Sequence, residues 1–484
     1  MTRHTWIPSL ALVAGCASSS LPPPPPAPPL SLTPVVAPSA TPQTPATPHA
    51  PQPAPAPGSA KPPRPTTLDP AAIDAWVAAQ VKAQELVGAS LVVVKDGQTI
   101  LAKGYGTTAV DGGSPVTPDT AFGIGSVTKQ FACAAAIALE DDKKLSMSDR
   151  VARWYPKATR AADITLDDLG AHLAGYPDYY PLDFVDRRMR DAIAPDDLLA
   201  RYAGGALDFE PRRRWSYSNT GFVMLGRVVE RVSGKPFGEL LRARFFGPLG
   251  MKSSSLGPGA APHATGHTSF ALGAPERATL EGDGWLHAAG GVWSSAQDLA
   301  RWDLALADGK VLSPAGAAKL ATARRTSDGR STDYGCGIGV RHAGGETILQ
   351  HGGAVSGFLA FNAVVPRTRS AVILLVNSDH GSPGDIHQTI LGLLLAQSRN
   401  APKVAGVSAR DAALDLFRQM QKGEIDRTRV GAELSAYLSP ERLREAAPRL
   451  AALGEPKSVI ADPPGERGGL EVSSVKLSTF TKER

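Results

Sequence analysis

The sequence predicts a mixed α and β domain of roughly 330 residues, built around one antiparallel sheet. Residues 89–103 contain an apolar, β-branched run, the turn Lys95-Asp96-Gly97 and a second strand-like run, which is the pattern of a β-hairpin. Residues 358–377 repeat this pattern around Pro366-Arg367-Thr368-Arg369. Helical patterns occupy the sequence between the two hairpins. We therefore expect segments remote in sequence to pair and to close one sheet.

Three segments have the residue spacing of helices. Residues 71–83 place apolar side chains on one helical face, and residues 126–140 are rich in alanine. Apolar residues also recur at helical spacing further on, at Phe222, Leu225, Val228, Val229 and Val232. Gly234 follows the last of them and is expected to end that helix.

The first sixteen residues have the organisation of a bacterial export signal. Arg3 supplies a positive charge, and residues 7–14 form an apolar stretch well below the roughly 20 residues that a membrane-spanning helix needs. Leu12-Val13-Ala14-Gly15-Cys16 resembles the lipobox of bacterial lipoproteins, in which the signal is cleaved before an acylated cysteine. We expect residues 1–15 to be a signal peptide and Cys16 to anchor the exported protein in a bacterial membrane. An ordinary signal peptide with an incidental cysteine is the alternative.

The rest of the chain divides by composition. Residues 16–66 are mostly Pro, Ala, Ser and Thr and cannot bury a core, so we expect an extended, solvated tether. Residues 67–400 carry the globular pattern described above. In residues 401–484 an amphipathic helix is predicted by Ala412, Leu414, Phe417 and Met420, further helical pattern follows, and residues 469–481 resemble a strand. We interpret residues 401–484 as a small accessory region.

Charge and cysteine content narrow the functional classes. The 484 residues include 51 basic and 46 acidic ones, a net charge of +5 that is spread along the chain. This gives no reason to expect nucleic acid as a partner, although an anionic polymer such as cell wall would not be repelled. The three cysteines argue against a disulfide framework and against a cysteine-rich metal site. We expect Cys133 and Cys336 to be small buried apolar residues rather than a pair.

The run Ser126-Val127-Thr128-Lys129 has the elements of an activated nucleophile. A serine hydroxyl reacts well only when a base removes its proton, and a side chain three positions on in a helix lies on the same face. Lys129 can be that base if burial or a neighbouring charge lowers its pKa by several units from about 10.4. Taken alone, the same run also fits a helix-capping serine followed by an exposed lysine.

Two further runs carry polar groups suited to a hydrolase. In Tyr217-Ser218-Asn219, the tyrosine could share or relay the serine proton, and the asparagine offers a donor and an acceptor to a substrate amide. In His351-Gly352-Gly353-Ala354, paired glycines allow close approach of a substrate, and the amides of Ser126 and Ala354 could form an oxyanion hole. Each run also fits a plain structural loop, respectively a helix-capping loop and a turn before a hairpin.

Together the three runs resemble the serine β-lactamase and penicillin-binding family, in its class C and D-Ala-D-Ala carboxypeptidase branch. The resemblance extends from about Ala71 to Leu393. Ser126–Lys129 matches the first motif, Tyr217–Asn219 matches Tyr-x-Asn, and His351–Gly353 occupies the place of Lys-Thr-Gly. Residues 164–175 and 288–299 also look like the family.

The resemblance implies a β-lactamase-like fold, with an antiparallel sheet flanked by helices and a helical subdomain. It implies that Ser126 attacks a carbonyl to form an acyl-enzyme while Lys129 and Tyr217 manage its proton, and that water then releases the acyl group. Asn219 and the strand that carries His351, Gly353 and Ala354 would hold the substrate. No metal or cofactor is implied. The expected partners are a small-molecule or peptide acyl substrate, such as a cell-wall fragment, and the lipid bilayer through Cys16.

The third run departs from the family pattern at Gly352, which stands where a hydroxyl residue helps to bind the substrate carboxylate in β-lactamases. We therefore expect hydrolysis of an ester or amide by an esterase or D-amino-acid peptidase. A true β-lactamase or a D-Ala-D-Ala carboxypeptidase is the alternative. His351 could be a neutral donor, a partial cation near neutral pH, or a structural residue.

Two other classes compete with this reading. An α/β-hydrolase esterase would need a Gly-x-Ser-x-Gly run, which the sequence lacks. A non-catalytic cell-wall-binding or sensor protein could keep the fold without turnover. The presence of Ser126, Lys129 and Tyr217 together argues against that possibility.

Overall fold

The computed structural model describes residues 64–180, 187–269, 273–397, 409–461, 465–467, 470–472 and 475–479. The expected signal peptide, the expected lipidation site Cys16 and nearly all of the expected tether lie outside these ranges. Within them, no helix combines the length and the apolar character needed to cross a bilayer.

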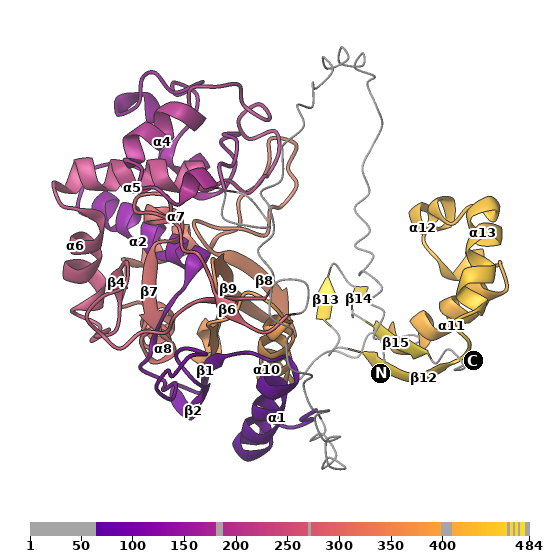
Figure 1. Ribbon diagram of the computed structural model, residues 1–484. Coiled ribbons are helices and arrows are strands. Elements are labelled where there is room, and N and C mark those ends of the chain that lie inside the picture. The colour runs from indigo at the N-terminus through magenta and orange to yellow at the C-terminus, as the bar shows by residue number, and fades with distance from the viewer. Residues whose placement is uncertain are drawn as a thin grey trace, which may run out of the picture. The chain divides into compact units, whose positions relative to one another are not determined.

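Six antiparallel strands form the central sheet (Figure 1). In spatial order they are β2 (Gln98–Gly106), β1 (Gly88–Lys95), β11 (Ser370–Val376), β10 (Phe358–Val365), β9 (Glu346–Val355) and β8 (Gly339–Ala343). The two predicted hairpins are β1–β2 and β10–β11, and both are confirmed. They meet inside the sheet, where Leu91 pairs in register with Leu374. Segments from opposite ends of the domain thus close one sheet, as expected.

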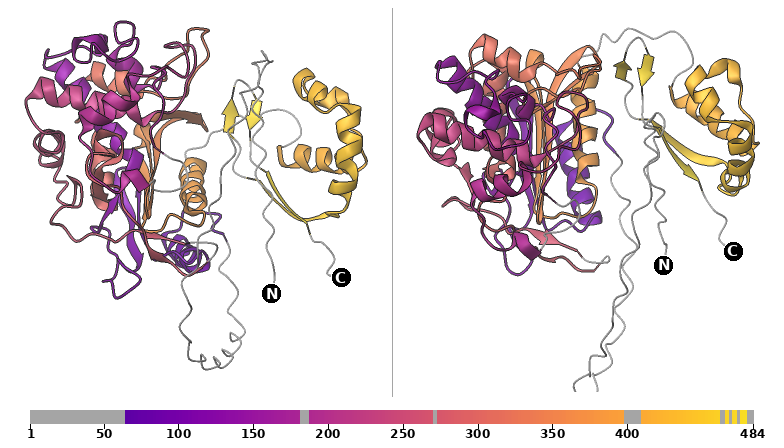
Figure 2. Two further views of the ribbon diagram at one scale, coloured as in Figure 1. Left: turned by 45° about the horizontal axis from the view of Figure 1, so that its top comes forward. Right: turned by 90° about the horizontal axis from the view of Figure 1, so that it is seen from above.

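Helices cover both faces of this sheet (Figure 2). They are α1 (Pro70–Ala83) and α10 (Pro383–Gln397) on one face, and α8 (Ala296–Ala307) with α2 (Thr128–Asp141) on the other. Strand β1 shows why both faces are apolar, because successive side chains of a strand point in opposite directions. Leu91 and Val93 belong to the cluster with α1 and α10, whereas Val92 and Val94 belong to the cluster with α8 and α2.

A largely helical region is inserted between β2 and β8. Its helices are α3 (Leu166–Gly170), α4 (Pro195–Tyr202), α5 (Asn219–Ser233), α6 (Phe237–Leu241), α7 (His287–Gly290) and α9 (Pro314–Ala321). Two small sheets, β3 (Ala121–Gly123) with β7 (Val292–Ser295) and β4 (Ser255–Leu256), and β5 (His267–Thr268) with β6 (Glu276–Arg277), complete it. Helix α5 packs against both α2 and α7. It ends at Gly234, which adopts a left-handed φ of 69° as a C-cap, in agreement with the prediction.

The helix expected from Ser126 begins two residues later than predicted. Residues Gly125–Val127 form a short 3-10 turn, η1, and the α-helix α2 starts at Thr128. Tight turns of this kind are common at helix ends. Ser126 therefore lies in the turn that enters α2 rather than in the helix.

Cys133 and Cys336 form a disulfide, which corrects the expectation of two unpaired cysteines. Both are fully buried, as expected, Cys133 in α2 and Cys336 in the segment before β8. The fold brings these segments together across 203 positions of sequence, a separation from which no local pattern predicts pairing. Gly170 leaves room for the bond, because a Cβ at this position would lie 2.5 Å from Cys336 Sγ.

The C-terminal region contains helices followed by strands. They are α11 (Ala409–Gln421), α12 (Ala432–Tyr437), α13 (Pro440–Ala451), β12 (Pro456–Ala461), β13 (Gly465–Arg467), β14 (Leu470–Val472) and β15 (Val475–Thr479). The amphipathic helix predicted here is confirmed as α11, which packs against α13. Strand β12 pairs with β15, and β13 pairs with β14, both antiparallel.

Candidate active site

Ser126 lies in the turn η1, between β3 and α2, with its side chain partly exposed. The turn is tight because Gly125 adopts a φ of +49°, a left-handed conformation that favours glycine. A Cβ at Gly125 would also lie 2.8 Å from the amide nitrogen of Ala354. The glycine before Ser126 therefore allows the serine to sit at the start of α2 and beside β9.

Lys129 lies in the first turn of α2, and its side chain is fully buried. Its nitrogen Nζ is 3.0 Å from Ser126 Oγ. Nζ also donates hydrogen bonds to Asn219 Oδ1 and to the carbonyl oxygen of Ala289, each at 2.7 Å. The structure thus brings together the serine and the lysine that the sequence singled out.

The surroundings of Lys129 suit a base. Burial lowers the pKa of Lys129 from its usual range to about 7, and the carboxylate of Asp178 partly opposes that shift. A neutral amine has two hydrogens and one lone pair. The hydrogens are taken by Asn219 Oδ1 and by the Ala289 carbonyl, which can only accept. The lone pair is then left for the proton of the Ser126 hydroxyl.

Tyr217 precedes α5, and its ring faces the same lysine. Nζ of Lys129 lies 4.7 Å from the centroid of the Tyr217 ring. Burial raises the pKa of the Tyr217 hydroxyl, and a hydrogen bond with Ser126 acts in the opposite direction. The phenol is therefore protonated at neutral pH, where it can donate a hydrogen bond or pass its proton on in a relay but does not act as a phenolate base. The ring is held by His172, whose centroid lies 4.2 Å away.

The side-chain amide of Asn219 is engaged within the protein on both sides. Its Oδ1 accepts from Lys129, and its Nδ2 donates to both carboxylate oxygens of Asp178, at 3.1 Å each. The backbone nitrogen of Asn219 also donates to Asp178 Oδ1, at 3.1 Å. We expected this amide to offer a donor and an acceptor to a substrate. In this structure the amide orients Lys129, and Asp178 orients the amide.

His351 is a neutral histidine with two protein partners. Its Nδ1 lies 2.5 Å from the carbonyl oxygen of Gly352, which can only accept, so Nδ1 carries the ring hydrogen. Its Nε2, at 2.7 Å, then accepts from the hydroxyl of Tyr334. Burial, together with the charge of Lys129, lowers the pKa of His351 to about 4. Of the three roles considered for His351, the low pKa argues against the partial cation near neutral pH, and the two protein partners favour the structural role.

The strand after His351 runs directly against the nucleophile turn. A Cβ at Gly353 would lie 2.0 Å from the carbonyl oxygen of Ile124 and 3.1 Å from the amide nitrogen of Ser126, so only glycine fits. Strand β8 pairs with β9 only as far as Gln350. Among the described residues, positions 351–355 therefore have no strand partner on that edge. Strand β9 thus brings the backbone nitrogen of Ala354 against the turn that carries Ser126, where the expected oxyanion hole would form.

Sequence reasoning missed three groups of this site, Asp178, Tyr334 and the Ala289 carbonyl. Asp178 follows a turn-forming Gly175-Tyr176-Pro177 run, which signals a loop but not the direction of its carboxylate. Tyr334 lies in a loop before β8 and contacts His351 only through the fold. A backbone carbonyl leaves no signal in the sequence at all.

The polar groups of the site are suited to proton transfer. Lys129 is hydrogen-bonded to Ser126 and Asn219, Asp178 to Asn219, and His351 to Tyr334, while the ring of Tyr217 lies over Lys129 Nζ. In the parts of the chain that the structure describes, no three His, Cys, Asp or Glu side chains are arranged to hold a metal ion.

Comparisons with known proteins point to one family. The family model for Beta-lactamase matches residues 73–397. A D-aminopeptidase of Gluconobacter oxydans (strain 621H) is 26% identical over 294 residues, which cover 60% of this chain and 55% of that protein. A penicillin-binding protein of Bacillus subtilis (strain 168) is 25% identical over 325 residues, which cover 62% of this chain and 70% of that protein. The chain thus spans little more than half the length of the D-aminopeptidases that it matches.

Solved structures show the same fold. An octameric penicillin-binding protein homologue from Pyrococcus abyssi superposes with a TM-score of 0.60 at 24% identity, covering 72% of this chain and 81% of that one. A D-amino acid amidase from Ochrobactrum anthropi SV3 superposes with a TM-score of 0.57 at 23% identity, covering 66% of this chain and 96% of that one. The fold, the order of the three motifs and the family model agree, and the chain belongs to the β-lactamase family.

Proposed function

We propose that the chain is a serine hydrolase that cleaves amide bonds through an acyl-enzyme on Ser126. One observation carries the proposal: Lys129 Nζ lies 3.0 Å from Ser126 Oγ, in surroundings that bring the pKa of Lys129 to about 7. The names of the similar D-aminopeptidase and D-amino acid amidase support an amide, specifically one of a D-amino acid, as substrate. Esters with the same acyl group would react by the same route.

The proposed reaction begins with proton transfer from Ser126 Oγ to neutral Lys129. Oγ then bonds to the substrate carbonyl carbon, and the oxygen that gains the negative charge accepts hydrogen bonds from the amides of Ser126 and Ala354. The carbon–nitrogen bond breaks as the leaving nitrogen takes a proton, and the protonated Tyr217 lies close enough to Ser126 to relay it. Water repeats the sequence on the acyl-enzyme, and Ser126 leaves with its proton restored.

The unpaired edge of β9 supports binding of a peptide-like substrate. Residues 351–355 run past Ser126, and no strand in the described parts of the chain pairs with them on the β8 side. An extended amide substrate could add to this edge as a further strand, which would place its carbonyl beside Ser126. Gly353 and Ala354 would then contact the substrate through their backbone, whereas His351 would support the strand.

A β-lactamase or a D-Ala-D-Ala carboxypeptidase is less well supported than an amidase. Gly352 is exposed on the same edge and offers no hydroxyl to a substrate carboxylate. We propose weak or no turnover of β-lactams for that reason. The hydrogen-bonded Ser126, Lys129 and Tyr217 also argue against a non-catalytic role.

We further propose that the protein is exported and anchored to a bacterial membrane through Cys16. The proposal is supported by the charge, apolar stretch and lipobox-like ending of residues 1–16. The buried disulfide between Cys133 and Cys336 supports export independently, because disulfides persist in oxidising compartments. The proline-rich residues up to 66 would then hold the hydrolase away from the bilayer.

The hydrolase proposal is tested by labelling and by a substrate panel. We expect a fluorophosphonate to label the wild type and not Ser126→Ala, because the reagent bonds to an activated serine oxygen. The panel comprises D-amino-acid amides, p-nitrophenyl esters, D-Ala-D-Ala peptides and nitrocefin. Ser148→Ala is the matched control, since Ser148 is exposed and outside the site. Labelling that survives in Ser126→Ala would overturn the assignment.

A further inference from the structure

A cavity of about 320 Å³ lies beside the nucleophile turn. Its apolar lining comes from segments remote in sequence and includes Leu256, Leu286, Trp293, Val355 and Phe358. Trp293 and Phe358 contact each other edge to face, with ring centroids 5.0 Å apart, so this part of the wall is rigid. The size and lining suit one apolar side chain.

The cavity shares its wall with the catalytic groups. Val355 directly follows Ala354, whose amide belongs to the proposed oxyanion hole. A Cβ at Gly290 would lie 3.6 Å from Val355 Cγ1 and 3.8 Å from the carbonyl carbon of Gly125. Gly290 also follows Ala289, whose carbonyl accepts from Lys129. Through Gly290, the wall of the cavity therefore contacts Gly125, the residue before Ser126.

A carboxylate is fixed in the wall of this cavity. Glu281 lines it, and its Oε1 accepts from the backbone nitrogen of Ser356 at 3.2 Å, from Ser356 Oγ at 2.8 Å and from the hydroxyl of Tyr180. No described residue donates to its second oxygen, Oε2. Because three donors hold Oε1, the orientation of the carboxylate is fixed, and with it the position of Oε2. Tyr180 in turn donates its backbone N–H to Asp178, so Glu281 is connected to the catalytic network.

The charge of the cavity selects cations. Asp283 adds a second, exposed carboxylate to the lining, and none of the described residues that line the cavity is a lysine or arginine. The imidazole of His287 is turned to Glu230, with Nε2 3.3 Å from Glu230 Oε1. An ammonium group would be attracted here, and a carboxylate would be repelled.

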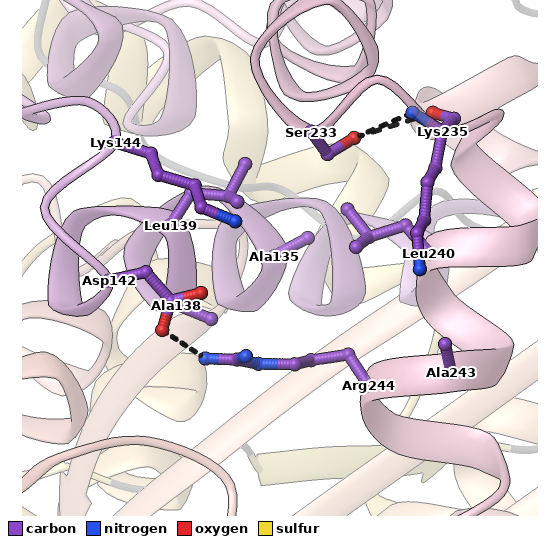
Figure 3. A pocket seen from close by; sticks show the side chains of 10 residues that line it. All are labelled: Ala135, Ala138, Leu139, Asp142, Lys144, Ser233, Lys235, Leu240, Ala243 and Arg244. Atoms are coloured by element: carbon purple, nitrogen blue, oxygen red, sulfur yellow. Dashed lines mark hydrogen bonds and ion pairs between the residues drawn. The ribbon is translucent and has the colours of Figure 1, made fainter.

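A second cavity in the same domain has a basic lining, in contrast to the acidic lining of the cavity beside Ser126. It has a volume of about 220 Å³ and lies over the C-terminal half of α2, where Figure 3 shows Lys144, Lys235 and Arg244 around an apolar floor. Arg244 is paired with Asp142 at 2.8 Å. This basic cavity would repel an ammonium group, and it lies at the end of α2 away from Ser126. It therefore supplies a control site in the same protein.

We propose that the cavity beside Ser126 binds the apolar side chain of the substrate's acyl residue, and that Glu281 binds the α-ammonium group of that residue. This inference rests on the proposed function. The acyl residue would be held at three points, its carbonyl carbon at Ser126, its side chain in the cavity and its ammonium at Glu281. Three fixed attachments around one carbon distinguish the two enantiomers, so the same arrangement would make the enzyme stereoselective.

Kinetics with matched substrates test the two contacts separately. We expect Glu281→Gln to reduce the preference for D-phenylalanine amide over its N-acetyl derivative by about tenfold, since a charge-assisted hydrogen bond is lost. We expect Leu256→Phe to shift the preference from D-phenylalanine amide toward D-alanine amide, because the larger side chain occupies the cavity. Ala243→Leu fills the basic cavity instead and should change neither ratio.

Binding measurements separate this proposal from the proposed function. In a Ser126→Ala background, titration calorimetry should detect D-phenylalanine amide more tightly bound than its N-acetyl derivative, and Glu281→Gln should remove the difference. If the Ser126→Ala variant binds in this way but the wild type hydrolyses none of the substrates, the hydrolase proposal is refuted and the pocket proposal stands. Equal binding of both compounds, or ratios that Glu281→Gln and Leu256→Phe leave unchanged, would overturn the pocket.

Discussion

Asp178 holds the side-chain amide of Asn219 in one orientation. The Nδ2 of Asn219 lies 3.1 Å from each carboxylate oxygen of Asp178, so its Oδ1 must turn toward Lys129. The same carboxylate raises the pKa of Lys129 against the larger effect of burial. Asp178 thus influences the base in two ways without touching the nucleophile.

We expect Asp178→Asn to shift the pH dependence of the reaction. Without the carboxylate, the pKa of Lys129 falls from about 7 to a lower value, so the lysine becomes neutral at lower pH. The ascending limb of kcat/KM against pH should move to lower pH, and kcat should fall because Asn219 loses its fixed orientation. The measurement is a pH profile with a D-amino-acid amide. Asp119→Asn, a change at an exposed site, is the control; an unmoved limb in Asp178→Asn would contradict this role.

The pH profile of the wild type reports Lys129 directly. A base acts in its neutral form, so kcat/KM should rise with pH through an apparent pKa of about 7 and then level off. His351 does not contribute to this limb, because its pKa is about 4. Lys129→Arg places a permanently charged group there that cannot accept a proton, and we expect it to lower kcat by about 10²–10⁴-fold. A limb that stays at pH 7 in that variant would assign the titration to another group.

The sequence predicted those parts of the fold and site that depend on local pattern. The spacing of apolar residues and the turn-forming residues within short segments predict both hairpins, helices α1 and α5, and the end of α5 at Gly234. The pairing of Ser126 with Lys129 follows from the three-residue spacing at the start of a helix. Asp178 and Tyr334 reach the site through irregular loops, whose direction no local pattern specifies. The contact between Asn219 and Asp178 was not predicted for the same reason, since Asp178 comes from another segment.

Gly352 offers a test of substrate preference. Its position is exposed, and a Cβ there would meet nothing nearer than the Ala360 carbonyl oxygen at 3.9 Å, so a larger residue fits. We expect Gly352→Thr to raise kcat/KM for nitrocefin by about tenfold, because its hydroxyl can bond to the substrate carboxylate. Gly352→Ala is the matched control, since it adds the Cβ without the hydroxyl. Equal effects of the two substitutions would show that the hydroxyl is not what limits β-lactam turnover.

The proposed anchor is tested at Cys16. Only a cysteine sulfur can receive the thioether-linked lipid of a lipoprotein, so Cys16→Ser should move the protein from the membrane fraction to the soluble fraction of a bacterial host. Ser18→Ala alters a neighbouring residue and should leave the fractionation unchanged. Immunoblotting of both fractions measures the distribution. Membrane association that persists in Cys16→Ser would refute lipidation.

The disulfide links the two halves of the candidate site. Cys133 lies one turn after Lys129 in α2, and Cys336 lies two residues after Tyr334, the partner of His351. We expect the double variant Cys133→Ala, Cys336→Ala to be less stable by about 2–4 kcal/mol, because the unfolded chain is no longer cross-linked. Its kcat should also fall, since α2 and the Tyr334 segment lose their covalent connection.

Urea unfolding with and without a reductant checks this prediction. Both sulfurs are fully buried, so a reductant should act on the wild type only as the protein unfolds, and should lower its unfolding midpoint to that of the double variant. The double variant has no bond to reduce and should be insensitive. A wild-type midpoint that the reductant leaves unchanged would mean that the two thiols are not paired. Such a result would also remove the independent support that the bond gives to export, because buried free thiols are equally compatible with a reducing compartment.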